Sequence, residues 1–445
     1  MGITDSLQQQ QFDVVIIGAG VAGAMSAILC SRAGLKTVLM DRQSFSRDKV
    51  CGCCLNGRAM QVLKMAALDA GVMRLNPSTT SALAIRYRGR KLDLPMPTSV
   101  AVSRRALDQY LVEVAISSGC CFVDNVTATV KPTDDEVFAS ESCSGERGAV
   151  ITATMLNEAN SYSAFDLKSS GQSSELRFVE LRATSSVLGN SQHGSVETNS
   201  KIPVSPVAAK VVLVCDGLGH PSLHRLKGFL APATAGSRIG LGAVFDRTMA
   251  DDWIRPLEVV MAIGSHGYAG VVQIENNRLN LAAAIDPEHL NKTTSPLMAL
   301  QSIFESAGVS APRNLPTASI KGTVSLTRTA ERIAGHRLFL LGDSTGYIEP
   351  FTGEGMAWAL SAASAIIPLV RCAVQDGWSD DMPARWRQIF RQIVSREQKI
   401  CRLLSASLRR PWLLHPLMTT CQLFPTLTRR IVGHINRVPD ALESS

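Results

Sequence analysis

Aromatic and charged side chains are both scarce in this chain of 445 residues, at 5% and 19% of the total. No stretch interleaves Lys or Arg with aromatic rings, which is the pattern that contacts nucleic acid, so we expect no nucleic-acid partner. The net charge of +7 is mild and fits at most a weak preference for anionic surfaces. Hydrophobic residues make up 45%, which is enough for two or three domains with their own cores.

The marks of a secreted or membrane-spanning protein are also missing. The eleven cysteines do not form a secreted disulfide pattern in a chain of this length. The start, MGITDSLQQQQ, is polar and lacks the apolar core of a signal peptide. The most apolar stretch, 14–30, is broken by three glycines, so it is typical of a strand, turn and helix and not of a membrane span. We therefore expect a cytoplasmic protein.

The clearest motif lies near the N-terminus, in DVVIIGAGVAGAMSAILCSRAGLKTVLMDR. An apolar strand leads into Gly18, Gly20 and Gly23, a helix follows, and a second strand ends at Asp41. Gly18 permits the tight turn, Gly20 lets the backbone approach a pyrophosphate, and Gly23 lets helix and strand pack closely. Free N–H groups at the helix start suit phosphates, and Asp41 suits the ribose hydroxyls. The sequence therefore predicts a Rossmann-like dinucleotide-binding unit.

A second motif lies more than three hundred residues later, in RLFLLGDSTGYIEPFTGEGMAWAL. An apolar strand ends in Gly342 and Asp343, and a loop leads to a helix that starts near Gly353 and Gly355. The Asp343 carboxylate suits a ribityl hydroxyl, and the positive end of the helix would stabilise an anion on the pyrimidine end of a flavin ring. The alternative is an ordinary strand–loop–helix unit in which Asp343 is a helix cap.

The region between these motifs changes character several times. An apolar strand over 210–215 ends in Asp216 and Gly217, although Asp-Gly is also a common turn pair. Residues 132–206 are rich in Ser, Thr, Gly and Asn, which indicates short strands around a long polar insertion. Residues 238–285 alternate repeatedly between apolar and polar, which predicts an antiparallel sheet.

These motifs, in this order, resemble the flavoprotein superfamily of class A aromatic hydroxylases and geranylgeranyl reductases. The segment SFSRDKVCGCC resembles its Arg-x-Lys-x-Cys-Gly segment and SRRALDQYL its Arg-x-x-x-Asp helix, which implies Cys51 beside the flavin and Arg104 near the FAD. The segment GDSTGYIEPFTGEG is most similar to the geranylgeranyl reductase branch. The resemblance covers 12 to about 370, apart from the polar insertion, and implies FAD as the cofactor.

One segment departs from that branch. Its reductases carry Gly-Tyr-x-Trp-x-Phe-Pro where this chain has HGYAGVVQ, so Gly267 and Tyr268 match while Gly270, Val272 and Gln273 replace Trp, Phe and Pro. A glycine in place of Trp opens space beside the flavin ring and argues against a long prenyl chain as substrate. The Trp-x-Trp-x-Ile-Pro run of flavin-dependent halogenases is absent from the sequence, which argues against halogenation.

The expected fold is α/β: a Rossmann-like FAD domain, an inserted antiparallel-sheet substrate domain and a helical C-terminal tail. We expect the FAD domain over 12–80, 100–225 and 332–372, the substrate domain over 81–99 and 226–331, and the tail over 373–445. The expected cofactor-binding residues are Gly18, Gly20, Gly23, Asp41, Arg42, Arg104, Val126, Asp216, Gly217, Gly342, Asp343, Pro350, Gly353 and Gly355. Cys51 and Tyr268 are the candidate catalytic residues, as acids that could supply a proton.

The expected function is an FAD-dependent oxidoreductase that reduces a double bond in a hydrophobic small molecule, isoprenoid or polyketide-like. The alternatives are an FAD-dependent monooxygenase that uses NAD(P)H and oxygen, and an electron-transfer flavoprotein that passes electrons to a quinone. No second glycine motif follows a strand, so NAD(P)H would bind transiently, or an electron-donor protein or quinone would supply the electrons.

Two further segments leave alternatives open. Cys51, Cys53 and Cys54 lack the second ligand pair that zinc would need, so we expect no metal. The tail mixes Arg with Trp, Leu and Phe between Arg409 and Arg430. That pattern is typical of a helix on a membrane surface, or of a helix whose apolar side packs on the flavin domain.

Overall fold

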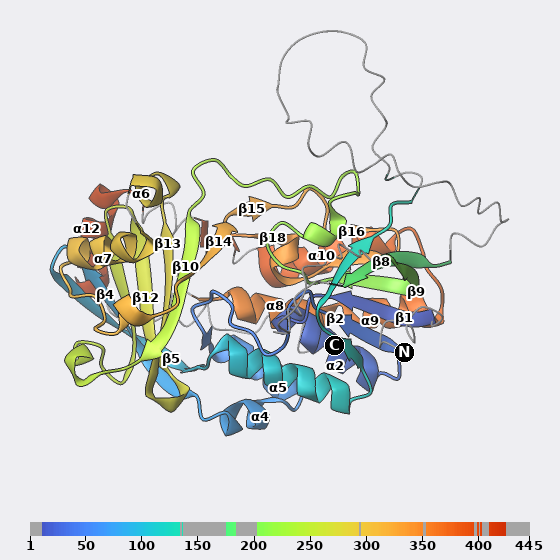
Figure 1. Ribbon diagram of the computed structural model, residues 1–445, viewed down its shortest axis with the longest axis horizontal. Coiled ribbons are helices and arrows are strands. Elements are labelled where there is room, and N and C mark those ends of the chain that lie inside the picture. The colour runs from blue at the N-terminus through green and yellow to red at the C-terminus, as the bar shows by residue number, and fades with distance from the viewer. Residues whose placement is uncertain are drawn as a thin grey trace, which may run out of the picture.

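The computed structural model describes residues 11–133, 136, 175–183, 203–292, 295–349, 353–395, 398–399, 401–402 and 409–423. Two eight-stranded sheets, each with helices packed against it, make up the α/β fold, and α8 lies between them in the view of Figure 1. Pro350, most of the polar insertion and the basic end of the tail, including Arg430, lie outside the described residues.

The first sheet is built around the N-terminal strand. Its order is β16 (Ala334–Gly335), β17 (Leu338–Leu340), β9 (Pro203–Val214), β1 (Gln11–Ile17), β2 (Thr37–Met40) and β6 (Cys121–Val123). The pairs from β17 to β6 are all parallel, as in a Rossmann-like unit. β7 (Val126–Val130) and β8 (Arg177–Ala183) extend the sheet, with β8 antiparallel to both β7 and β9.

Both faces of this sheet are apolar because its central strands are covered on both sides. Val14 and Ile16 face a helical layer, while Val15 and Ile17 face the side of β7 and β8. The helical layer consists of α2 (Val21–Arg32), α3 (Gly57–Met65), α4 (Asp69–Arg74), α5 (Arg104–Ser117), α8 (Gly355–Ala365), α9 (Ile367–Gln375) and α10 (Met382–Phe390). The stretch 14–30 is therefore a core strand and helix, as its glycines predict.

One helical stretch among the described residues, Gly355–Gln375, is long and apolar enough to cross a membrane. However, 61% of its apolar window is buried inside the protein, because α8 and α9 belong to the core of the first sheet. A buried core helix has the same composition as a spanning helix, so this stretch is explained by its packing.

The second sheet is mixed. Its order is β14 (Lys321–Ser325), β10 (Ile239–Asp246), β13 (Arg278–Ile285), β12 (Gly267–Ile274), β11 (Leu257–Gly264), β4 (Ser78–Tyr87), β5 (Arg90–Ala101) and β3 (Cys54–Leu55). Neighbouring strands are antiparallel, except that β11 runs parallel to β4, a strand from much earlier in the chain. α7 (Pro296–Ala307) covers one face of this sheet, and the opposite face carries Tyr268 and Gly270.

Apart from one helix of the tail, the remaining elements are short. They are β15 (Arg328–Thr329), β18 (Gly346–Tyr347), α6 (Pro287–Lys292), and the single turns at Pro221–Leu223, Met249–Asp251, Glu275–Asn277, Leu315–Thr317, Gly342–Thr345 and Arg391–Ser395.

The described part of the tail divides between the two sheets. On α10, Trp386 is fully buried in the core of the first sheet, and its indole N–H donates to the Leu340 carbonyl at 3.2 Å. On α12 (Pro411–Leu423), Leu414 and Met418 pack instead in the cluster that contains Tyr268. Between Arg409 and Leu423, the apolar side of the tail therefore packs on the second sheet and not on the first, whereas α10 earlier in the tail packs on the first.

Trp386→Ala is expected to lower the free energy of unfolding by about 3–5 kcal/mol, because it empties a fully buried site and removes the bond to Leu340. Urea denaturation followed by circular dichroism measures this. Arg385→Ala, an exposed position on the same helix, is the matched control and should stay within about 0.5 kcal/mol. Equal stability of the two variants would contradict the packing of α10.

Candidate functional site

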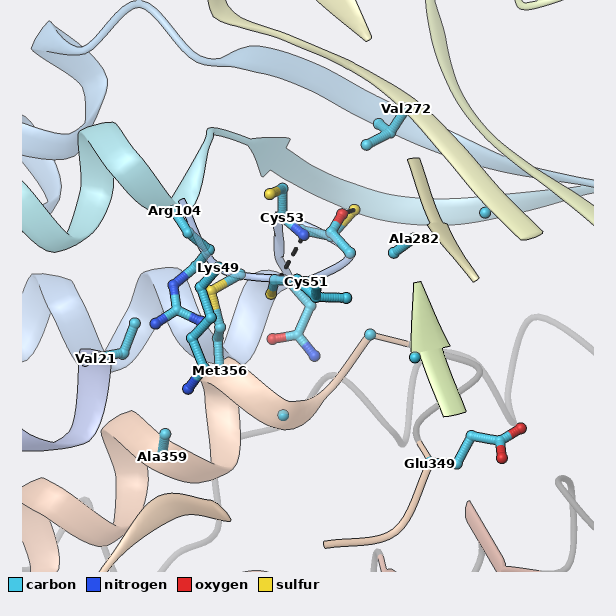
Figure 2. Close-up of a pocket in the computed structure, with 18 of the residues that line it drawn as sticks. Val21, Lys49, Cys51, Cys53, Arg104, Val272, Ala282, Glu349, Met356 and Ala359 are labelled. Carbon is cyan, nitrogen blue, oxygen red and sulfur yellow. Dashed lines mark hydrogen bonds between the residues drawn. The ribbon is translucent and has the colours of Figure 1, made fainter. Parts of the chain in front are cut away.

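A large cleft separates the two sheets. Figure 2 shows Val21 of α2 with Met356 and Ala359 of α8 on one side, and Val272 and Ala282 of the second sheet on the other. The cleft holds about 1800 Å³ of empty space, counting its open mouth. The part of it that can take up water-sized groups is about 240 Å³, a little below the roughly 300–1,000 Å³ that is typical of a pocket for one small molecule.

The three glycines at the start of α2 have two different roles. A Cβ on Gly18 would lie 2.4 Å from the Cys215 carbonyl oxygen, and one on Gly23 would lie 1.9 Å from the Gly18 carbonyl oxygen. Those two positions are therefore demanded by close packing, and Gly18 also has a φ of +99°. A Cβ on Gly20 would meet only the end of the Arg104 side chain, at 3.5 Å. Gly20 borders open space in the cleft.

The N-terminus of α2 fits a pyrophosphate. Gly20 is its N-cap residue, and within the described chain no side chain caps the first turn. Its leading N–H groups therefore remain available to a ligand that accepts hydrogen bonds, and the helix dipole favours an anion there. This open cradle is what FAD binding requires.

Asp41 belongs to a buried chain of ion pairs. Its Oδ2 accepts from the Ala19 N–H at 2.9 Å and from Arg47 Nη2 at 2.8 Å. Arg47 Nη1 also donates to Asp108 Oδ2 at 3.0 Å, and Arg104 makes two 2.8 Å bonds to the same carboxylate. Burial alone would raise the pKa of Asp41, but the bonds and charge of Arg47 bring it below its ordinary value. Asp41 thus stays ionised at the end of β2.

The second motif meets the first inside the cleft. Gly342, with a φ of +60°, packs where a Cβ would lie 3.1 Å from the Ala22 side chain. The partly exposed Asp343 carboxylate lines the cleft, with Lys49 Nζ 3.6 Å away. Gly353 and Gly355 line it as well, at the start of α8, where the side chain of the N-cap residue Glu354 does not cap the first turn and instead accepts from the Cys401 thiol at 3.5 Å. A second helix N-terminus therefore opens into the cleft.

Of the Asp-Gly pair after β9, only the glycine lines the cleft. Asp216 accepts from the Ser222 N–H at 2.8 Å and from the Ser344 hydroxyl at 3.2 Å, and burial raises its pKa. It joins the loop after β9 to the loop after β17 and does not line the cleft. Gly217 does line the cleft, and its N–H donates to Ser344 Oγ at 3.1 Å.

Arg42 and Val126 lie beside Asp41 and outside the cleft. Arg42 follows Asp41 directly and is exposed. The Val126 N–H donates to the Asp41 carbonyl at 3.0 Å, and the Val126 side chain is buried in the core. Their positions fit contacts to the adenosine end of a dinucleotide through the backbone or the surface.

On the opposite wall, Tyr268 is buried on β12. The Arg238 guanidinium lies 5.6 Å from the centre of its ring and donates to Glu349 Oε1 at 3.1 Å and Asp286 Oδ1 at 2.9 Å. Burial raises the pKa of Tyr268 well above its ordinary value, Glu349 and Tyr347 add to this, and Arg238 opposes it. Tyr268 is therefore a neutral phenol that keeps its proton at neutral pH.

Glu349 is a residue that the sequence motif did not single out. It lines the cleft, is 2% exposed, and is held by Arg238 and, at 3.8 Å, by Arg409. The available signal in the sequence was an acidic residue between two apolar residues in the loop after Asp343. Its burial could not be inferred from the sequence, because the arginine that pairs with it lies 111 residues away.

The space expected beside Gly270 is partly filled. A Cβ on Gly270 would lie 2.8 Å from Met261 Sδ on the neighbouring strand, so the Met261 side chain occupies this position. Ala282 and Ala284 extend the same small-residue surface along β13. Methionine is flexible, so the shape of this wall can adapt to a substrate.

Cys51 lies at the centre of the cleft (Figure 2). Its Sγ accepts from the Cys53 N–H at 3.5 Å. A hydrogen bond from the Cys53 thiol and then the charge of Arg104 lower the pKa of Cys51 to about 5, against the effect of burial. Cys51 is thus a thiolate at neutral pH, which favours Tyr268 as the acid of the two candidates.

Nowhere in the described ranges do three or more His, Cys, Asp or Glu side chains form a group that could hold a metal.

A second, more polar cavity lies on the far side of Arg238. Arg409 and Asp286 line it together with His266 and His289, whose rings stack with centres 4.3 Å apart. Arg238 therefore separates a polar cavity from the apolar cleft, and it contributes to the lining of the polar one.

Comparisons with known proteins agree with FAD as the cofactor. A family model described as an FAD binding domain matches residues 11–152. Menaquinone reductase of Mycolicibacterium smegmatis is 25% identical over 96% of this chain and 93% of its own length. Digeranylgeranylglycerophospholipid reductase 1 of Methanopyrus kandleri is 22% identical over 88% of this chain and 91% of its own.

Among solved structures, p-nitrophenol 4-monooxygenase from Pseudomonas putida has the same fold, with a TM-score of 0.69 at 12% identity over 98% of this chain and 99% of that one. The glycine cradle, the two helix N-termini and these similarities lead to one conclusion. The chain carries an FAD-binding domain and is an FAD-dependent oxidoreductase, similar to the geranylgeranyl reductases and class A flavin monooxygenases.

Proposed function

We propose that the chain reduces a carbon–carbon double bond in a largely apolar molecule, isoprenoid or polyketide-like, that lies between the flavin and β12. The observation that carries the proposal is Tyr268, a buried and protonated phenol on the substrate side of the cleft. Reduction of a double bond needs a hydride and then a proton, and a positioned side chain commonly supplies the proton. Tyr268 is assigned that role.

The FAD would be held by residues of the first sheet and its helices. The α2 N-terminus at Gly20 takes the pyrophosphate, Asp41 the ribose, Asp343 the ribityl chain, and the α8 N-terminus the pyrimidine end of the ring. When bound, FAD supplies the hydride chemistry, while the protein orients the reactants and excludes water. The electron donor is assigned to transient NAD(P)H or to a partner protein, without a domain of its own.

The wall facing the flavin indicates the class of substrate. It is formed mainly by apolar side chains, among them Leu83, Val259, Met261, Val272 and Ala282. Such a surface suits a hydrocarbon and offers few partners to a polar substrate. The similarity to a menaquinone reductase along nearly the whole chain supports a reductase that acts on an isoprenoid or quinone-like molecule.

A monooxygenase on the same fold is the second candidate. The similarity to a nitrophenol monooxygenase supports the fold that such an enzyme needs, and an apolar cleft excludes water as hydroxylation requires. A hydroxylase would not need the proton of Tyr268 for attack on a ring. An electron-transfer flavoprotein that serves a quinone is the third, and steady NAD(P)H oxidation without a protein partner would count against it.

Product analysis under labelled oxygen gas separates the first two functions. We expect a product that gains two hydrogens and carries no labelled oxygen, because the buried proton donor serves reduction. Mass spectrometry of the product from an isoprenoid quinone reads both quantities in one experiment. A product with one labelled oxygen atom would replace reduction by hydroxylation.

Tyr268→Phe is expected to lower kcat about 10²-fold or more, because it removes the proton donor and keeps the ring that packs beneath Arg238. The rate of flavin reduction by the electron donor should not change. Tyr87→Phe, in the same apolar cluster, is the matched control and should retain activity. An unchanged kcat in Tyr268→Phe would remove the residue from the mechanism.

Gly20→Val is expected to abolish FAD binding without unfolding the protein, since its side chain enters open space that the pyrophosphate needs. Asp343→Ala should weaken binding by about 1.5–3 kcal/mol through loss of a charged hydrogen bond. Flavin content and fluorescence titration measure both. Gly322→Ala, on an exposed edge strand with room for a methyl group, is the control. Full flavin occupancy in Gly20→Val and Asp343→Ala would place the site elsewhere.

A further inference from the structure

We propose that Cys51 is a site of oxidation by hydrogen peroxide and that Cys53 converts the oxidised form into a Cys51–Cys53 disulfide. The pair would act as a reversible switch in the wall of the cleft. The proposed double-bond reduction makes no use of Cys51, so this inference does not depend on that reaction.

The two cysteines are placed for such a bond. The chain bends at Cys51, and the Cys53 N–H points at Cys51 Sγ, 3.5 Å away. Cys53 itself has a left-handed backbone, with a φ of +59°. Two steps along the chain limit the Cα–Cα distance to about 7.6 Å, and a turn shortens it toward the 4.4–6.8 Å that a disulfide spans.

The loop that carries them is anchored on both sides. The side chain of Asn280 on β13 donates to the Cys51 carbonyl at 2.9 Å. The Val102 N–H donates to the Cys53 carbonyl at 3.0 Å. Because β13 and β5 both belong to the second sheet, these bonds fix the loop to that sheet in the wall of the cleft, so a change in Cys51 and Cys53 acts directly on the cleft.

The three neighbouring cysteines differ in reactivity. Cys51 is half-buried and lines the cleft, where a small peroxide can reach it. With a pKa of about 5 it is the thiolate that peroxide requires. A hydrogen bond to Cys51 and burial raise the pKa of Cys53 well above its ordinary value, and burial raises that of Cys54 to about 12. Cys51 therefore reacts first, and a protonated thiol stands beside it.

The chemistry balances without any further reactant. The Cys51 thiolate attacks one oxygen of hydrogen peroxide, the O–O bond breaks, and the departing hydroxide takes up a proton to become water. Cys53 sulfur then attacks the sulfur of the sulfenic acid on Cys51, the S–S bond forms, and the hydroxyl group leaves with the proton of Cys53 as a second water. The two sulfurs lose two electrons, which the peroxide gains.

Cys53 is the partner in preference to Cys54. Its N–H and its thiol both bond to Cys51. The Cys54 thiol instead donates to the Gly52 carbonyl at 3.3 Å. Formation of the disulfide removes the negative charge that Arg104 faces and constrains the loop, so we expect catalytic turnover to fall about tenfold or more and to recover with dithiothreitol.

The test treats the purified FAD-bound protein with hydrogen peroxide, alkylates the remaining thiols and identifies peptides by mass spectrometry. The native protein should yield a peptide with Cys51 and Cys53 joined, two hydrogens lighter. Cys53→Ser should stop at a sulfenic acid on Cys51 that dimedone traps. Cys51→Ser should form neither product. Cys54→Ser, the matched control, should form the disulfide as the native protein does.

Three outcomes would overturn the proposal: a native protein that is oxidised beyond the sulfenic acid without a disulfide, a disulfide that persists in Cys53→Ser, or a Cys51 that does not react. Alkylation of native Cys51 as a function of pH needs no variant, and we expect half-maximal rate near pH 5. A midpoint near the ordinary thiol value of about 8.5 would also reject it. A protein that forms the disulfide but reduces no double bond would refute the proposed function alone.

Discussion

The buried chain of ion pairs from Asp41 through Arg47 and Asp108 to Arg104 is the constraint on which the cleft depends. Each of these charges would be costly to bury alone, and loss of one partner typically costs about 3–5 kcal/mol. The end of β2, the loop that follows it and the first turn of α5 must therefore stay together. Because Arg104 is held there, its side chain lies beside both Gly20 and Cys51.

On the wall that carries Tyr268, the buried arginine is surrounded by carboxylates. Arg238 is 3% exposed and is shared between Glu349 and Asp286. These two carboxylates largely offset its positive charge at the Tyr268 ring. Burial then keeps Tyr268 protonated, whereas Cys51, with Arg104 and the Cys53 thiol next to it, loses its proton. One cleft thus holds a proton donor and a thiolate on different walls, and their environments assign the two roles.

The parts that sequence predicts well are those set by local chemistry. The glycine motif predicts the β1–α2 turn because of the backbone that its glycines pack against. Gly23 packs against the nearby backbone of Gly18, and Gly18 packs against the backbone of Cys215, at the end of the strand beside β1 in this unit. The parallel pairing of β11 with β4 and the buried contact between Arg238 and Glu349 join residues more than a hundred positions apart. The local spacing of apolar residues carries no information on such contacts. The mixed sheet and the position of Glu349 beside Tyr268 are therefore seen only in the structure.

The tail shows how these distant contacts unite the molecule. Trp386 is buried with the first sheet, Met418 with the second, and Arg409 lies between them in the chain. Arg409 donates to the Gly236 carbonyl at 2.8 Å and lies 3.8 Å from Glu349. The segment 409–423 therefore adds a positive charge to the carboxylates that already hold Arg238. Glu349 is also one of the groups that raise the pKa of Tyr268, so this segment of the tail contacts the same carboxylate that faces the proposed proton donor, although sequence alone suggested only a surface or packing role for it.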